Sequence, residues 1–325
     1  MNMRAIVVEE PGGPEALIIK DIPRPEPKPG WVLIKVMGFG LNRAELMTRK
    51  GWSGDAVKFP RVIGIECVGT VAADPDGTFK EGQRVATLMG EMGRAYDGSY
   101  AEYTLVPARQ VLAIETDLDW NTFAALPEMF QTANGSLKES LKIEAGGTLF
   151  IRGGTSSVGM AAATLAKHHG LTVVATTRKV ERETKLRENG ADHVVIDHGG
   201  NLNEDLRKIF PDGVDYVLEL IGTKTLNDSL SMLAPGGKCC MTGVLGDAWD
   251  LNNWNPMQYI WNGTYLTAYG GHSMAREDLQ EIVDGVVAGD IRVNADRVFA
   301  FDEIVQAHEY MEANKATGKV VVSLV

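Results

Sequence analysis

The chain of 325 residues contains only three cysteines, Cys67, Cys239 and Cys240. They are too few and too irregularly spaced for a disulfide framework or a four-cysteine zinc site. No apolar run approaches the roughly 20 residues that a membrane-spanning helix needs. The N-terminus, Met1 to Arg4, leads into a strand pattern rather than an apolar signal core. These shortages predict a cytoplasmic protein.

Basic residues are also in deficit, with 32 Lys and Arg against 43 Asp and Glu and a formal net charge of -11. A nucleic-acid partner is therefore not expected, because phosphate backbones require a basic face. A length of 325 residues predicts two domains, each large enough to bury its own core.

One stretch, residues 148–159, gives the clearest indication of the fold. Residues 148–151 read as a short buried strand, a glycine-containing turn follows, and apolar spacing predicts a helix that begins at Ser156 or Ser157. Gly154-x-Ser156-x-x-Gly159 is a variant of the dinucleotide fingerprint G-x-G-x-x-G. The serine is small enough for a pyrophosphate to approach, its hydroxyl can donate to phosphate, and the helix N-terminus favours an anion. A strand-turn-helix without a ligand is the alternative.

Repetition of this unit favours the dinucleotide reading. Further strands are predicted at 171–176, 193–196, 214–220 and 238–241, and the intervening segments 180–189, 202–210 and 224–233 have helical patterns. Strands alternating with helices form right-handed βαβ units and a parallel sheet. The predicted fold class is therefore α/β, with a Rossmann doubly wound parallel sheet.

The residues after the second strand bear on the choice of dinucleotide. An NAD site places an acidic residue about 20 positions after the glycine turn. Here the window 175–179 contains no acid, and Arg178 and Arg182 lie four residues apart. Two guanidinium groups suit a 2′-phosphate, which favours NADP(H). The alternative is a solvated basic helix start, in which Glu181 and Glu183 pair with the two arginines.

The chain on either side of this fold has a different character. Up to about residue 119 it is rich in β-type runs and turns, and a helix is predicted over 121–141. The last elements, at 276–288, 297–300, 301–314 and 319–325, have no place in a nucleotide sheet. We therefore assign 1–120 and 268–325 to one β-rich domain and 121–267 to a Rossmann domain inserted into it.

Several motifs carry a resemblance across the whole chain: the segments 40–45, 60–69, 98–103, 235–237 and 318–321, together with the Gly154 turn. With them the sequence resembles the medium-chain dehydrogenase/reductase superfamily, and within it the zinc-free quinone oxidoreductase (zeta-crystallin-like) branch. The resemblance implies a GroES-like catalytic domain, a six-stranded Rossmann domain, and a homodimer formed through the Rossmann edge strands.

Two departures bear on metal chemistry. The zinc alcohol dehydrogenases of this superfamily have a cysteine at the position of Asn42 and a histidine at that of Ile65, which precedes Glu66. Neither an amide nor an isoleucine replaces a zinc ligand, and a lobe with four cysteines is missing, so no metal is expected. Without a Lewis acid we expect hydride transfer to a quinone or an α,β-unsaturated carbonyl. An enoyl-thioester reductase and a non-catalytic NADPH-binding protein are the alternatives.

The resemblance also implies site residues. Asn42 matches an asparagine near the nicotinamide, whose amide could donate to a substrate carbonyl; alternatively it caps the turn after Gly40. Met47 and Ser53 stand where relatives often have tyrosines, so the proton is expected from solvent or a cofactor ribose hydroxyl. Thr132 matches a threonine that binds the nicotinamide carboxamide; alternatively its hydroxyl bonds its own helix backbone.

Other predicted contacts follow the strands. His198 resembles a residue flanking the 2′-phosphate and adenine, or is an ordinary loop residue. The aromatic segment 249–261 walls a substrate pocket or lies at a dimer interface. The predicted cofactor-binding residues are Asn42, Thr132, Gly154, Thr155, Ser156, Ser157, Val158, Thr177, Arg178, Arg182, His198, Ile221, Gly243, Val244, Leu245, Leu266 and Tyr269, the last two placed after a sixth strand.

Overall fold

A computed structural model describes residues 1–272 and 274–325, and its contacts divide the chain into two compact units. Unit 1 comprises residues 1–131, 272–288 and 293–325, and unit 2 comprises 132–271 and 289–292. The first division therefore falls at residue 131 rather than at 120. The reason is that α2 (Trp120–Ala124) packs against strands of unit 1.

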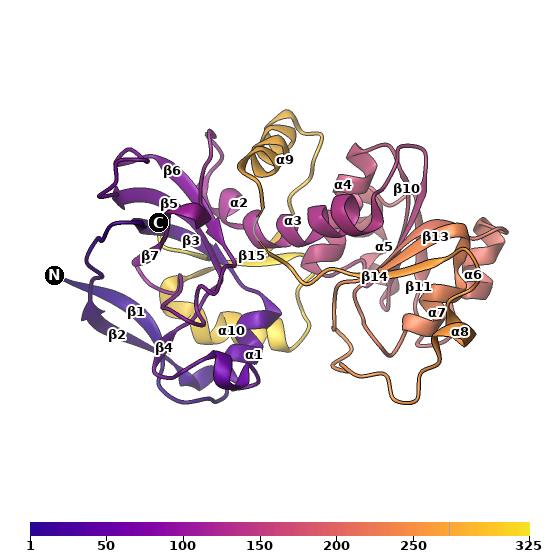
Figure 1. The fold of residues 1–325 in the computed structure, drawn as a ribbon, viewed down its shortest axis with the longest axis horizontal. Helices are drawn as coiled ribbons and strands as arrows, with labels where there is room; N and C mark the ends of the chain where they lie inside the picture. The colour runs from indigo at the N-terminus through magenta and orange to yellow at the C-terminus, as the bar shows by residue number, and fades with distance from the viewer. Residues whose placement is uncertain (273) are drawn as a thin grey trace. The chain divides into compact units, whose positions relative to one another are not determined.

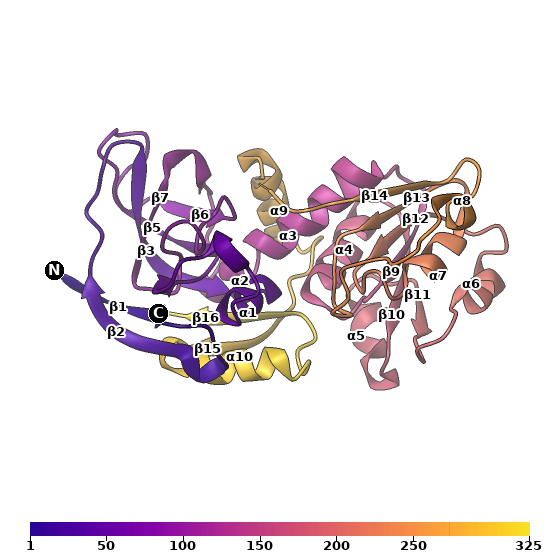
Figure 2. The same ribbon diagram turned by 60° about the horizontal axis from the view of Figure 1, so that its bottom comes forward.

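Unit 1 contains two β-sheets. The smaller has the order β2-β1-β4 and the larger has the order β15-β16-β3-β5-β6-β8, with β7 paired to β3. Helix α10 (Ile304–Glu312) packs against β15 and β16 (Figure 2). The strands are β1 (Asn2–Val8), β2 (Leu17–Pro23), β3 (Trp31–Gly40), β4 (Arg61–Val62), β5 (Glu66–Ala73), β6 (Arg84–Leu88), β7 (Tyr103–Pro107), β8 (Val111–Ala113), β15 (Ala295–Ala300) and β16 (Lys319–Ser323).

The C-terminal segment returns to unit 1, because β16 pairs antiparallel with β3. Strands β4 and β5 are separated by a short break in the β-structure. Gly64 lies between them with φ +110, and a Cβ there would lie 2.4 Å from Ser99 Oγ. The break directs β5 into the larger sheet and brings its first residue, Glu66, into the interior.

Unit 2 contains one six-stranded sheet in the order β11-β10-β9-β12-β13-β14, in which every neighbouring pair is parallel. This order defines a doubly wound dinucleotide-binding fold and confirms the predicted fold class. Figure 1 shows strands of this sheet with helices around them. The strands are β9 (Thr148–Arg152), β10 (Thr172–Thr177), β11 (His193–Ile196), β12 (Val214–Glu219), β13 (Leu233–Met241) and β14 (Tyr265–Ala268).

Helices connect these strands and flank them in the chain. The single helix predicted over 121–141 is interrupted at Pro127, which lacks a backbone N–H, and ends in a π-helical turn. Helix α4 begins at Ser157, as predicted. The helices not yet given are η1 (Pro14–Ala16), α1 (Arg43–Arg49), η2 (Gly54–Ala56), η3 (Ala108–Gln110), α3 (Pro127–Asn134), η4 (Gly135–Leu141), α4 (Ser157–His168), η5 (Val180–Arg182), α5 (Glu183–Glu188), α6 (Asn203–Ile209), α7 (Leu226–Ser231), α8 (Pro256–Tyr259), α9 (Arg276–Ala288) and η6 (Phe301–Glu303).

Each unit has its own apolar core. In unit 1 the core includes Ile6, Phe39 and Val322, and in unit 2 it includes Phe150, Val217 and Leu230. No helix in the described part of the chain has the length and apolar character needed to cross a bilayer. The two cores hold β3, β16 and the parallel strands in place. The candidate site residues lie at or next to one end of each of these strands.

Candidate functional site

The predicted cofactor contacts of unit 2 gather where its parallel strands end. The Gly154 turn follows β9, Arg178 follows β10, His198 follows β11 and Ile221 follows β12. The Gly243 turn follows β13. Because parallel strands end at one edge of a sheet, these segments share that edge, which is where open α/β sheets bind ligands.

The turn between β9 and α4 has room only for small residues. Gly153 has φ +93. A Cβ on Gly154 would lie 2.9 Å from the Ala175 Cβ, and one on Gly159 would lie 2.5 Å from the Gly153 carbonyl oxygen. The turn therefore lies directly against β10 and the first turn of α4. It leaves the N-terminal amide groups of α4 at the sheet edge, which suits a phosphate.

Ser156 is the N-cap of α4. Its Oγ accepts a hydrogen bond from Gly159 N (3.1 Å) and donates one to the Gly153 carbonyl oxygen (2.8 Å). The sequence suggested that this hydroxyl donates to a phosphate. In the structure its hydrogen is used inside the turn instead. Its role in this structure is to close the turn and cap the helix.

The turns after β12 and β13 are joined to each other. Leu245 N donates to the Leu220 carbonyl oxygen (3.0 Å). A Cβ built on Gly153 would meet Ile221 Cδ1 at 3.3 Å and Leu245 Cδ1 at 3.4 Å. The structure therefore brings Gly153, Ile221 and Leu245 together, with Val244 in the same turn as Leu245.

Thr132 is connected to this edge through its backbone. Its carbonyl oxygen accepts a hydrogen bond from Ser136 Oγ (2.7 Å), and Ser136 Oγ lies 2.8 Å from Thr242 Oγ1. Thr242 immediately precedes Gly243. Ser136 therefore links Thr132 to the predicted cofactor-binding turn that begins at Gly243.

The predicted pair after the sixth strand needs correction. Leu266 does not follow that strand but lies within β14, where it pairs with Cys239. Tyr269 does follow β14, but only 7% of it is exposed. Its ring packs so closely on Gly135 that a Cβ there would lie 2.0 Å from Tyr269 Cζ. Tyr269 therefore packs against the start of η4.

Two arginines, Arg178 and Arg182, follow β10 on the adenine side of the predicted site. Arg178 is exposed directly after β10, and Arg182 is partly buried at the end of η5. The Glu183 carboxylate, a possible partner of those arginines, binds Arg187 at 2.9 Å. Thr177 Oγ1 accepts a hydrogen bond from Lys179 N (3.1 Å), which shapes the turn that presents Arg178.

His198 is exposed in a loop that Arg152 anchors. The Arg152 side chain is 1% exposed and binds Asp197 (3.2 Å), Asp228 and the Gly200 carbonyl oxygen (3.4 Å). The two carboxylates offset the cost of burying the Arg152 charge. Arg152 thereby fixes the loop that carries His198.

Asn42 lies in unit 1, in a buried cluster of charged side chains. Lys319 Nζ lies 2.5 Å from both Asn42 Oδ1 and Glu66 Oε1, and 3.5 Å from Glu128 Oε2. Asn42 Nδ2 donates to Glu66 Oε1 (2.9 Å) and to Glu45 Oε1 (3.3 Å). The amide is therefore held at both ends, and donation to a substrate carbonyl would require it to leave one carboxylate.

Glycine at position 40 leaves the room that this cluster needs. A Cβ on Gly40 would lie 2.2 Å from Lys319 Cε and 2.5 Å from Glu66 Oε1. Asn42 is also the N-cap residue of α1, and its backbone N–H donates to Glu45 Oε2 (2.9 Å), as in a capping box. The capping alternative for Asn42 is thus part of the structure.

The charges in the cluster shift each other's ionisation. Burial, followed by the nearby Glu66 carboxylate, raises the pKa of Glu45 to about 7. Burial alone would lower the pKa of Lys319, but the carboxylates of Glu66 and Glu128 outweigh it and hold that pKa above its ordinary value. Glu45 therefore changes charge near neutral pH.

The residues at the expected metal position do not fit a zinc ion. The Asn42 amide oxygen is occupied by the Lys319 ammonium, and Ile65 has no donor atom. Across residues 1–272 and 274–325, no group of three or more His, Cys, Asp and Glu side chains is arranged to hold a metal.

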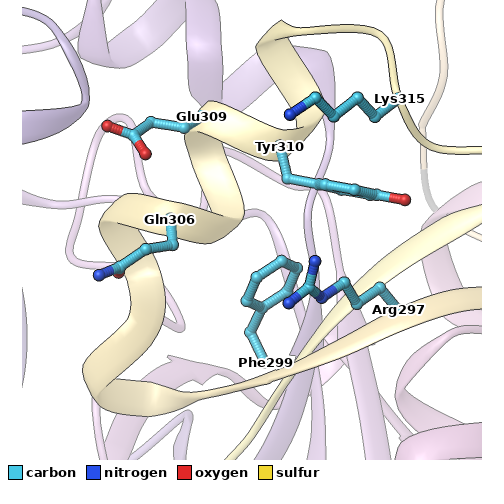
Figure 3. Close-up of a pocket in the computed structure, with 6 residues that line it drawn as sticks. All are labelled: Arg297, Phe299, Gln306, Glu309, Tyr310 and Lys315. Carbon is cyan, nitrogen blue, oxygen red and sulfur yellow. The ribbon is translucent and has the colours of Figure 1, made fainter.

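A small pocket of about 190 Å³ lies elsewhere in unit 1 (Figure 3). The Arg297 guanidinium stands over the rings of Phe299 (4.5 Å) and Tyr310 (5.3 Å). None of the predicted site residues is among its six lining residues, which are Arg297, Phe299, Gln306, Glu309, Tyr310 and Lys315.

Comparisons with known proteins show which families the chain resembles. The family model described as alcohol dehydrogenase GroES-like domain matches residues 28–116, and the one described as zinc-binding dehydrogenase matches 189–322. Quinone oxidoreductase from Sus scrofa is 29% identical over 331 residues, covering 99% of this chain and 98% of the relative. A Burkholderia 2-haloacrylate reductase is 26% identical, covering 98% of each chain. A mycobacterial protein complexed with NADPH is 27% identical with a TM-score of 0.85, covering 99% of each chain.

A parallel dinucleotide-binding sheet joined to a GroES-like unit is the arrangement of the medium-chain dehydrogenase/reductase superfamily, and the chain belongs to it. Within that superfamily it is a quinone oxidoreductase-like protein, and hence an NAD(P)-dependent oxidoreductase.

Several residues around the site were not found from the sequence. Lys319, Glu128, Arg152 and Glu219 are polar residues in apolar surroundings, which the sequence pattern alone does not distinguish from core positions. Glu45 had a local signal, because it lies three residues after Asn42 in capping-box spacing.

Prediction for Glu45. The pKa of Glu45 is raised from 4.5 to about 7, so the folded state binds its proton more tightly than the unfolded state. The stability that this proton contributes is present below about pH 4.5 and is lost as pH rises through 7. Relative to Glu45→Gln, the wild type should lose up to about 3 kcal/mol of unfolding free energy between pH 4.5 and 8.

Urea unfolding at pH 5, 6, 7 and 8 measures this difference. Glu181→Gln, the same substitution at an exposed side chain, is the matched control. A pH-independent difference between wild type and Glu45→Gln would contradict the assignment.

Proposed function

We propose that the protein is a zinc-independent, NADPH-dependent oxidoreductase that reduces a quinone or an α,β-unsaturated carbonyl compound. The observation that carries this proposal is the alignment with quinone oxidoreductases, which runs over 99% of this chain and 98% of the relative. The alignment therefore spans both units of this chain.

The choice of acceptor rests on the donor atoms in unit 1. An amide bound to an ammonium and an isoleucine cannot provide a Lewis-acidic zinc site, so a simple ketone would lack polarisation. A quinone or a conjugated enone is already activated toward hydride. The 2-haloacrylate reductase among the relatives acts, by its name, on a carbon–carbon double bond conjugated to a carboxylate, which favours conjugated acids and enones as a second candidate class.

The residues have separate roles in this proposal. NADPH, when bound, supplies the hydride. The turn 153–157 holds the pyrophosphate at the α4 N-terminus, Arg178 and Arg182 bind the 2′-phosphate, and the turns at 221–222 and 243–245 line the nicotinamide side. The Asn42 amide donates a hydrogen bond to the substrate carbonyl. To do so it gives up its bond to Glu45, which is the longer of its two bonds to carboxylates. The proton comes from solvent or a ribose hydroxyl.

The proposal extends to assembly and location. Strand β14 is an edge strand of its sheet; its first residue, Tyr265, is 58% exposed, and Trp261, four residues earlier in the chain, is 65% exposed. An unpaired edge bordered by aromatic side chains suits pairing with a second copy. We accordingly propose a homodimer through β14, in the cytoplasm.

Turnover assays test the activity. With NADPH, the protein should reduce a panel of benzoquinones and naphthoquinones or a panel of enals and enones, and EDTA should leave the rates unchanged. Acetone and cyclohexanone are the control acceptors and should not be reduced. Activity confined to simple ketones and lost with EDTA would overturn the proposal, as would no oxidation of NADPH with either panel.

Prediction for Ser156. A leucine at this position would fill the space where the pyrophosphate approaches the turn, so Ser156→Leu should abolish NADPH binding measured by calorimetry. Ser156→Gly is the matched control: it loses the cap but keeps the space, and it should bind NADPH with a stability loss of only a few tenths of a kcal/mol. Normal binding by the leucine variant would show that the pyrophosphate lies elsewhere.

Prediction for Arg178 and Arg182. A charge-assisted bond to phosphate contributes roughly 1.5–3 kcal/mol, so Arg178→Ala or Arg182→Ala should weaken NADPH binding about ten- to hundredfold. NADH makes no such bond, so its affinity should barely change. Calorimetry with both cofactors measures this selectivity.

Arg187→Ala is the control for these variants, because Arg187 pairs with Glu183 and is not expected at the 2′-phosphate. Equal affinity of the wild type for NADPH and NADH would refute the preference. A parallel loss of both cofactors would instead assign the arginines to holding the loop.

A further inference from the structure

Glu219 is a buried carboxylate that binds the backbone of the turn following it. It is the last residue of β12 and is 0% exposed. Its Oε1 accepts hydrogen bonds from Ile221 N (2.7 Å) and Gly222 N (3.0 Å), and its Oε2 accepts one from Ser229 Oγ (2.5 Å). A buried carboxylate is costly unless its oxygens are bonded, and here backbone amides and a hydroxyl fill that need.

The same residue also holds the neighbouring turn. The Glu219 carbonyl oxygen accepts hydrogen bonds from Thr242 N (2.9 Å) and Gly243 N (3.2 Å), which follow β13. The two turns are in close contact, because a Cβ on Gly243 would lie 2.4 Å from the Leu220 carbonyl oxygen. One residue thus ties together the ends of two neighbouring strands, through its side chain on one turn and its backbone on the other.

The sheet order separates these turns from the adenine side. Strands β12 and β13 lie on one side of β9, and β10 and β11 lie on the other. Arg178 and His198 follow β10 and β11, and their loops are shaped by Thr177 and Arg152. Arg152 is the neighbour of Glu219 across β9 and β12, but this contact is backbone strand pairing, whereas the Glu219 carboxylate bonds the turn after β12 and Ser229. A change confined to the Glu219 side chain therefore removes bonds on the nicotinamide side and leaves the strand pairing with Arg152 in place.

We infer that Glu219 is a positioning residue for the nicotinamide half of the cofactor, acting through the backbone of Ile221, Gly222 and Gly243. This inference rests on the proposed function. It assigns Glu219 no contact with the cofactor: the carboxylate fixes the turns, and the turns form the surface against which the nicotinamide half lies.

Two substitutions separate this role from a general structural one. Glu219→Gln keeps a carbonyl oxygen for the amides of Ile221 and Gly222, and its amide group can donate to the Ser229 hydroxyl. Glu219→Met has similar length but no acceptor, so both backbone N–H groups lose their partner. Calorimetry with NADPH and with adenosine 2′-monophosphate, which contains only the adenine half, measures each half of the site in the full chain.

Glu219→Met should bind NADPH about tenfold or more weakly, as expected when anchoring hydrogen bonds are lost, and bind adenosine 2′-monophosphate within about twofold of wild type. Glu219→Gln should restore NADPH binding to within about threefold. A parallel loss of both ligands in Glu219→Met, or unchanged NADPH affinity, would overturn the inference.

Ser229→Ala serves if Glu219→Met does not fold, because it removes only the donor to Oε2. It should weaken NADPH binding in the same selective way but less; a parallel loss or no loss would count against the inference. If the wild type bound neither ligand, the proposed function would fail and the inference with it. If the wild type bound both and the variants behaved identically to it, only the inference would fail.

Discussion

A single buried ammonium explains why distant parts of unit 1 occur together. Lys319 is fully buried and needs oxygen partners, which Asn42, Glu66 and Glu128 provide. Gly40 must lack a side chain because the Lys319 Cε occupies its Cβ position. Removing Glu66 would take away the carboxylate nearest to the buried ammonium, and proteins tolerate the loss of such a partner poorly. The motifs around residues 40, 66 and 319 are thus parts of one packing arrangement, and β16 is held beside β3 by charge as well as by its backbone pairing.

The arrangement of elements was largely predictable because periodicity and turn residues are local properties. The βαβ alternation, the start of α4 and the return of the C-terminal segment all follow from them. Helix 121–141 was predicted as continuous because its apolar spacing persists, whereas Pro127 and the π-helical turn interrupt it. The start of β13 at Leu233, five residues before the predicted start at 238, depends on pairing with β12, which only the folded sheet reveals.

The candidate site was predicted less completely, for a physical reason. Residues that follow strands can be located from the strand pattern, and so Ile221, Gly243 and Arg178 fall at the sheet edge. Leu266 was misplaced because the sixth strand has only four residues, so an error of two or three positions moves a residue from inside the strand to beyond it. Residues that act through long-range contacts, such as Lys319 with Asn42 or Arg152 with Asp228, leave no local pattern, because their partners are 277 and 76 positions away in the chain.

The burial of Arg152 has a consequence for behaviour in salt. Its partners Asp197 and Asp228 are only 12% and 16% exposed, whereas Arg178 is exposed. Dissolved ions screen charges in solvent over about 8 Å at physiological ionic strength, but they act much less on buried pairs. Raising ionic strength should therefore weaken only the attraction between exposed cations and a phosphate, while the loop that carries His198 keeps its shape. The decrease of ligand affinity with rising salt concentration would then depend on the solvent-exposed charges that contact the phosphate, and not on the buried Arg152 pairs.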